Sequence, residues 1–246
     1  MNWNIYYSRE NGRKVRLKIK RISEHIWSIS SWFIIPFNVW LVKDDEGVSL
    51  VDTGISTMGS GILKFIDKLD VDPLSRILLT HGHSDHVGSI KKIRLKREVP
   101  IYAHREEIPY MEGKLPYPRR KKSQALVESS IATPLEEDAS NNLTSIGDLM
   151  PYHTPGHSPG HVVYYHQKDS VLIGGDLFTS RRHKLQKPMA MFTGNMDQAI
   201  KSGQIVKLLK PKILCVCHGS TVQNPHEQYD VLQKNYFHNR RNAWTN

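Results

Sequence analysis

His81-Gly82-His83-Ser84-Asp85-His86 directly follows the apolar, strand-like run Ile77-Leu78-Leu79. Side chains that can bind a metal are therefore concentrated where a strand gives way to a loop. Buried imidazoles and a carboxylate this close together each need a hydrogen-bonding partner, and one metal ion can satisfy several of them. Imidazole with carboxylate is the ligand mixture of zinc, manganese and iron sites. The run therefore predicts a metal site, the alternative being a solvated loop that happens to be rich in histidine.

Length and composition indicate an ordinary globular chain. The 246 residues suffice for one large domain or two small ones, and 39% of them are apolar and 24% charged. No stretch approaches the ~20 apolar residues of a membrane span. Residues 1–6 carry neither the basic nor the apolar region of an export signal. We therefore expect a cytoplasmic protein that does not enter a membrane.

The chain carries a formal net charge of +10. A basic balance favours anionic partners, such as acidic metabolites or nucleic acid. The basic residues are dispersed, however, so the pattern favours a solvated surface over a nucleic-acid groove. We expect a small-molecule substrate, with an anionic molecule as one candidate and nucleic acid as the alternative partner. The sequence leaves the oligomeric state open.

The two cysteines, Cys215 and Cys217, lie in one strand-like run. At positions i and i+2 of a strand, both side chains point to the same face. Two thiolates alone make an incomplete structural zinc site. The pattern therefore favours two buried free thiols in a reducing compartment.

Hydrophobic spacing predicts strands and helices in both halves of the chain. Strands are expected within 14–55 and over 76–80, 99–103, 161–166, 171–174 and 213–217. Helices are expected over 58–69, 87–96, 196–209 and 225–237. Two halves of similar order indicate two sheets packed together with helices outside.

Residues 105–142 interrupt this order with a segment rich in charge and proline. Helical fragments are expected at 106–112 and 122–131. An irregular segment of this length is typical of a lid or a binding insertion, and a surface excursion is the alternative.

Three further candidate ligands lie far along the chain. His157 occupies a tight turn, Asp176 directly follows the strand 171–174, and His218 follows the strand 213–217. Strand ends of this kind gather at one edge of a sheet, so these side chains can converge with the histidine-rich loop.

In this order the residues resemble the metallo-β-lactamase superfamily, over about residues 20 to 220 and including Asp52-Thr53-Gly54 after its strand. The resemblance implies an α+β fold. It is a four-layer αββα sandwich, with two mixed sheets packed face to face and helices outside. We expect one such domain over 1–246, with a lid or insertion at 105–142.

The resemblance also implies a site for two divalent metal ions, with Zn²⁺ favoured and Mn²⁺ or Fe²⁺ as alternatives. The first ion would be held by His81, His83 and His157. The second would be held by Asp85, His86 and His218. Asp176 would bridge both ions.

This ligand set favours hydrolysis. An aspartate at the bridging position resembles the glyoxalase II, lactonase and phosphodiesterase branches, and His83 is intact where flavodiiron members have a carboxylate. We expect a hydroxide bridging two metals to attack a small ester, thioester or lactone carbonyl. Asp85 would be the catalytic residue that orients it and passes on a proton. The alternatives are a phosphodiesterase or ribonuclease of the RNase Z type, or a metal-binding member without hydrolase activity.

Four other residues are secondary candidates. Asp52 is expected to accept a hydrogen bond from a metal-bound histidine, the alternative being a turn-forming aspartate before Gly54. His161 is interpreted as a structural histidine. Arg181 and Arg182 follow Asp176 closely and are candidates for binding the carboxylate or phosphate of a substrate, the alternative being an exposed basic loop.

Overall fold

The structure is a computed structural model that describes residues 4–10, 13–32, 34–69 and 73–242. Parts of the expectations for the N-terminal residues and for the 14–55 strands fall on 1–3 and Phe33, which lie outside the described residues. Across the described ranges, no helix combines the length and the apolar character needed to cross a membrane.

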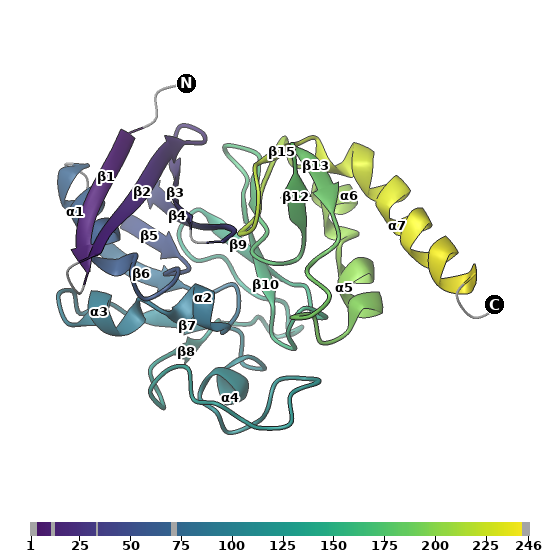
Figure 1. Ribbon diagram of the computed structural model, residues 1–246, viewed down its shortest axis with the longest axis horizontal. Coiled ribbons are helices and arrows are strands. Elements are labelled where there is room, and N and C mark those ends of the chain that lie inside the picture. The colour runs from purple at the N-terminus through teal and green to yellow at the C-terminus, as the bar shows by residue number, and fades with distance from the viewer. Residues whose placement is uncertain (1–3, 11–12, 33, 70–72, 243–246) are drawn as a thin grey trace.

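The first sheet runs in chain order from β1 to β8 (Figure 1). Its first five strands pair antiparallel, and the pairs from β5 onward are parallel, so the sheet is mixed. Its strands are β1 (Asn4–Glu10), β2 (Arg13–Arg21), β3 (Ile26–Trp32), β4 (Pro36–Asp44), β5 (Gly47–Val51), β6 (Leu74–Leu78), β7 (Ile101–Ala103) and β8 (Thr133–Pro134).

The second sheet has the strand order β15-β14-β11-β10-β9. Only β11 and β14 pair in parallel, so this sheet is mixed as well. Its strands are β9 (Leu149–His153), β10 (Val162–His166), β11 (Val171–Ile173), β14 (Ile213–Cys215) and β15 (Val222–Gln223). A separate hairpin is formed by β12 (Thr179–Arg181) and β13 (Lys184–Gln186).

Most of the helices lie on the outer faces of the two sheets, whereas α2 and α4 lie at the edge where the loops gather (Figure 1). The first sheet carries α1 and α3, and the second carries α5, α6 and α7. The helices are α1 (Gly59–Lys68), α2 (Ser84–Val87), α3 (Ile90–Arg94), α4 (Ile108–Met111), α5 (Met196–Ser202), α6 (Ile205–Leu209) and α7 (Pro225–Asn242).

Three buried apolar layers separate these elements, and β4 shows how the sequence makes them. Val39 and Leu41 pack toward α1 and α3, whereas Trp40 and Val42 pack toward the second sheet. Alternate side chains of a strand point to opposite faces, so a strand buried on both faces is a continuous apolar run. A third layer lies between the second sheet and α5 to α7. The predicted αββα sandwich of two mixed sheets is confirmed.

Several expected elements differ in the structure. The helix expected at 122–131 is wrong, because that segment forms an irregular loop in which the backbone N–H groups of Leu126 and Val127 bond to the carbonyl of Met111. The expected helix 196–209 is two helices separated at 203–204, and the expected helix 87–96 begins as α2 and resumes as α3. Sequence patterning missed β1, β9 and the β12–β13 hairpin.

Candidate metal centre

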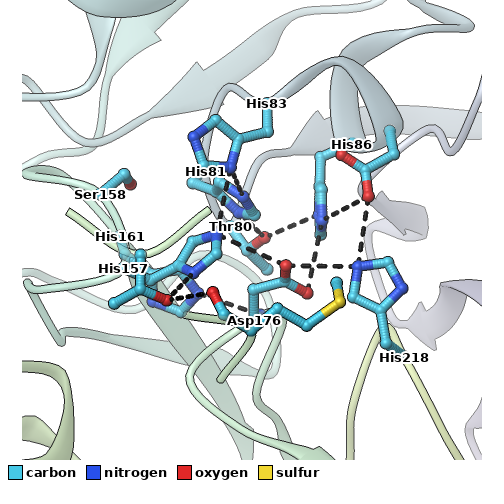
Figure 2. Close-up of polar contacts among 12 residues, drawn as sticks. Thr80, His81, His83, His86, His157, Ser158, His161, Asp176 and His218 are labelled. Atoms are coloured by element: carbon cyan, nitrogen blue, oxygen red, sulfur yellow. Dashed lines mark hydrogen bonds and ion pairs between the residues drawn. The ribbon is translucent and has the colours of Figure 1, made fainter. Parts of the chain in front are cut away.

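The candidate ligands follow strands whose carboxyl ends lie at the same edge of the two sheets. The loop after β6 carries His81 and His83, and α2 continues from it with Asp85 and His86. His157 lies in the turn after β9. Asp176 follows β11, and His218 follows β14, which pairs in parallel with β11. The fold therefore brings the seven predicted ligands together (Figure 2).

The first ligand group surrounds one point with three imidazole nitrogens. His81 Nε2 lies 3.0 Å from His83 Nδ1, and His157 Nε2 lies 3.1 Å from the same atom. Asp176 Oδ2 is 3.4 Å from His157 Nε2. A tetrahedral ion with bonds of about 2.0–2.1 Å needs ligand atoms about 3.3 Å apart. The three histidines and Asp176 have this spacing.

The second ligand group meets the first at Asp176. His218 Nε2 lies 3.2 Å from Asp85 Oδ2 and 3.3 Å from Asp176 Oδ2. His86 Nε2 lies 3.6 Å from Asp176 Oδ1 and 3.8 Å from Asp85 Oδ2. Asp176 thus turns one carboxylate toward both groups.

Three buried polar atoms at the centre of the cluster have no hydrogen-bond partner within the described ranges. They are His86 Nε2, Asp176 Oδ1 and His218 Nε2. Buried polar atoms are nearly always paired, so three orphaned atoms in one cluster require an explanation. Divalent metal ions between them would satisfy all three, and the residues present therefore fit such ions.

Hydrogen bonds fix the orientation of the two imidazoles nearest Asp52. His86 Nδ1 lies 2.7 Å from Asp52 Oδ2, and Thr80 Oγ1 donates to the same oxygen at 2.8 Å. Because its own proton is used in this way, Thr80 Oγ1 accepts from His81 Nδ1 at 3.1 Å. Each ring thus has its Nδ1 occupied and its Nε2 free to bind a metal.

The other two Nε2 ligands are held in the same manner. His218 Nδ1 donates to the carbonyl of Pro36 at 3.0 Å. His157 Nδ1 donates to Thr193 Oγ1 at 3.2 Å, which in turn donates to the carbonyl of Met189. Hydrogen bonds within the protein therefore determine which nitrogen of each ring faces the cluster.

Electrostatics differ between the two groups. Burial lowers the pKa of His81 well below its usual value and that of His157 to about 3, so both rings keep a free lone pair at neutral pH. For His218, the downward effect of burial is outweighed by Cys217 and by Asp176, and its pKa rises. The second group therefore holds protons that a metal ion would displace.

The loops that carry the ligands are tied together by Glu107, which sequence reasoning missed. Its Oε1 accepts from Gly82 N at 2.9 Å and from Tyr117 Oη at 2.8 Å. Its Oε2 accepts from Ser158 Oγ and Gly160 N, both at 2.8 Å. The side chain is fully buried. One carboxylate therefore joins the His81 loop, the His157 turn and the 105–142 segment.

His161 lies behind the ligands. Its Nε2 accepts from the backbone N–H of Asp176 at 3.2 Å, and its Nδ1 contacts Thr154 Oγ1 at 2.9 Å. Burial lowers its pKa well below the usual value, so the ring is neutral. Both of its nitrogens are used, and it supports the backbone that presents Asp176.

A cavity of about 200 Å³ opens beside the first ligand group. Its lining includes His83, His157, Tyr117, Arg119, Arg120 and Phe192. Arg119 donates to the carbonyls of Ala190 and Thr193. The Arg120 guanidinium lies 6.0 Å from the centre of the Phe192 ring, and no carboxylate pairs with it in the described ranges. The predicted residues Arg181 and Arg182 are exposed where β12 turns into β13 and do not line this cavity.

Comparison with known proteins places these observations in a family. The family model described as the metallo-beta-lactamase superfamily matches residues 36–218. The chain is 35% identical to "Probable metallo-hydrolase YybB" of Bacillus subtilis (strain 168), over 89% of this chain and 97% of that protein. It is 28% identical to a hydroxyacylglutathione hydrolase of Bdellovibrio bacteriovorus, over 76% of this chain and 64% of that protein.

Solved structures agree on the fold. A metallo-β-lactamase from Pontibacter korlensis superposes with a TM-score of 0.66 at 21% identity, covering 89% of this chain and 99% of that one. The matched residues 36–218 contain both ligand groups in full. This chain therefore belongs to the metallo-β-lactamase superfamily.

Proposed function

We propose that the protein is a hydrolase that uses two divalent metal ions, preferably Zn²⁺, to cleave a small, anionic ester, thioester or lactone. The observation that carries the proposal is the pair of ligand groups that share Asp176, with ligand atoms 3.0–3.8 Å apart. Ions held there would polarise a carbonyl oxygen and lower the pKa of water toward about 7. The two buried cysteines of the protein, which form no disulfide, also support a place in the cytoplasm.

Asp85 is the residue suited to move the proton. It faces His86 and His218 through Oδ2, and Oδ1 enters neither contact. Its side chain is 24% exposed, whereas that of Asp176 is 5% exposed. Asp85 can therefore reach a substrate, accept the proton of the attacking water and return it to the leaving group.

The cavity supports an anionic substrate. The positively charged Arg120 side chain lines the cavity next to the ring of Phe192, and no carboxylate among the described residues pairs with it. A guanidinium binds carboxylate and phosphate groups in a two-pronged manner. The hydroxyacylglutathione hydrolases among the relatives support a thioester as one candidate substrate.

A substrate panel tests the proposal. Metal-loaded protein is incubated with lactones, thioesters, carboxylate esters, phosphodiesters and β-lactams, and metal content is measured by mass spectrometry. We expect two metal ions per chain and turnover of at least one carbonyl substrate, abolished in His86→Ala. Turnover confined to phosphodiesters would support the RNase Z type of activity, and well under one metal ion per chain would contradict hydrolysis by this site.

A further inference from the structure

Cys217 lies against the second ligand group, although the mechanism above does not use it. It directly precedes His218 and is 1% exposed. Its sulfur lies within 4.8 Å of the ligand atoms that Asp85, His86 and His218 offer. The sulfur is thus a near neighbour of atoms that already form one side of a metal site.

The backbone of Cys217 is hydrogen-bonded on both sides, which fixes the direction of its Cα–Cβ bond. Its N–H donates to the carbonyl of Gly175 at 2.9 Å. Its carbonyl accepts from both the backbone N and the side-chain Nδ2 of Asn38, at 3.1 and 2.9 Å. The backbone from which the sulfur extends is therefore held beside the segments that carry Asp176 and His218.

We propose that the Cys217 thiolate is a further ligand of the ion held by Asp85, His86 and His218. This inference rests on the proposed two-metal function and adds a soft donor to it. When the sulfur–metal bond forms, the thiol releases its proton to solvent. A zinc–sulfur bond of about 2.3 Å places neighbouring ligand atoms about 3.4–3.8 Å apart, so a spacing of up to 4.8 Å requires a shift of about 1 Å. The orphaned Nε2 atoms of His86 and His218 independently mark an ion at this place.

Cys215 shows what a neighbouring cysteine does when it only packs. It lies two residues earlier, at the end of β14 and in the same apolar layer between the sheets. Burial raises the pKa of its thiol to about 12, so it stays protonated. None of the candidate ligand groups found among the described residues includes it. It therefore provides a control with the same residue type and burial, two residues away.

The consequence is that the second metal position would prefer zinc. Thiolate sulfur selects zinc over harder ions such as manganese, which prefer oxygen ligands. The first ion, bound by three imidazoles and Asp176, has no such donor. The two positions therefore differ in chemistry even though one carboxylate joins them.

Cobalt substitution tests the ligand directly, because a cobalt–thiolate bond gives an intense charge-transfer absorption in the near ultraviolet. Metal-free protein is titrated with Co²⁺ to two equivalents, and bound cobalt is counted by mass spectrometry. We expect the band in the wild type and in Cys215→Ser. In Cys217→Ser and Cys217→Ala the band should be absent while two cobalt ions still bind. In zinc–manganese competition, Cys217→Ser should lower the preference for zinc.

The outcomes separate the two proposals. Two bound cobalt ions without a charge-transfer band in the wild type would overturn the Cys217 ligand and leave the two-metal hydrolase intact. A band that persists in both Cys217 variants would also overturn it. Failure of the wild type to bind a second ion would overturn the two-metal function and the Cys217 ligand together.

Discussion

Asp52 holds the left-handed backbone conformation, with φ of 60°. In this position its Oδ1 accepts from Thr80 N at 2.8 Å, and its Oδ2 faces His86 Nδ1 and Thr80 Oγ1. The side chain is fully buried. Asp52 therefore orients His86, one of the candidate ligands of the second ion proposed above.

Replacing this carboxylate should weaken metal binding. In Asp52→Asn, the amide offers one acceptor atom where the carboxylate offers two, so His86 Nδ1 or Thr80 loses its partner. Loss of such a partner costs about 10–100-fold in metal affinity or activity, and we expect this loss at the second ion. Competition with a chromophoric chelator measures it. Asp67→Asn, which removes an exposed ion pair with Arg97, is the control, and equal affinities in both variants would contradict the role of Asp52.

Replacing Glu107 should lower the stability of the protein as well as disturb the site. Four donors converge on its two oxygens. In Glu107→Gln the amide nitrogen replaces one acceptor and leaves buried donors unpaired, at about 1–3 kcal/mol each. We expect this loss in the free energy of unfolding, measured with urea on metal-free protein. The exposed neighbour Glu106→Gln should change it little, and matching values for the two variants would count against the role of Glu107.

At the scale of elements, β7 and β9 meet through two histidines. His104 follows β7 and stacks on His153 at the end of β9, with ring centres 4.0 Å apart. Burial, His153 and Arg105 lower the pKa of His104 from 6.5 to about 4. The folded protein therefore binds fewer protons here than the unfolded chain.

The stability of the metal-free protein should depend on this contact. Because the folded pKa of His104 is lowered, the contribution of this residue to the unfolding free energy should fall as the pH drops from about 6.5 to about 4, and this contribution should change little below that. The expected loss is about 2–3 kcal/mol. His104→Phe keeps the stacked ring and removes the titration. Urea unfolding at several pH values should give a shallower slope for this variant, and an unchanged slope would remove His104 as the cause.

The 105–142 segment and the β12–β13 hairpin offer competing sites for a substrate anion. Arg120 in the former lines the cavity, whereas Arg181 and Arg182 in the latter do not. We expect Arg120→Ala to raise KM for an anionic ester about tenfold, as for the loss of one charged hydrogen bond, with metal content unchanged. A rise in KM confined to Arg181→Ala or Arg182→Ala would indicate that the hairpin binds the anion and the cavity does not.

The sequence predicted the residues that cluster at the candidate site better than the residues that support them, for a physical reason. Histidines at strand ends form a local pattern in the sequence. The direction of the strands is enough to bring these histidines to one edge of the sheets. Glu107 stands among Arg105 and Glu106, where a buried carboxylate looks like part of a solvated charge run. Its partners come from three separate segments, which no local pattern reveals.

Element boundaries show the same limit. Apolar spacing located β4 and α1, because their periodicity reports directly on burial. It failed at 122–131, where the carbonyl of Met111 in α4 accepts two backbone hydrogen bonds and the chain forms an irregular loop. Contacts with residues remote in sequence therefore determine the conformation of that segment.

For the whole molecule, bound metal should be a major part of the stability. Each ion at 1,000 times its dissociation constant adds about 4 kcal/mol. Because 1 kcal/mol shifts Tm by about 2–4 °C in a chain of this size, removing one ion should lower Tm by about 8–16 °C. Calorimetry before and after chelation measures this shift. His218→Ala should show a smaller one, and no shift in the wild type would contradict tight binding.

Both ligand groups draw on both sheets, and this arrangement bears on how the chain could be divided. The first sheet and its loops supply His81, His83, Asp85 and His86, while the second supplies His157, Asp176 and His218. Each proposed ion would therefore need side chains from both halves. If the chain were cut between β8 and β9, neither fragment would retain a complete site, and the two fragments should reassemble only when metal is present. Metal binding would then make the pairing of the two fragments specific.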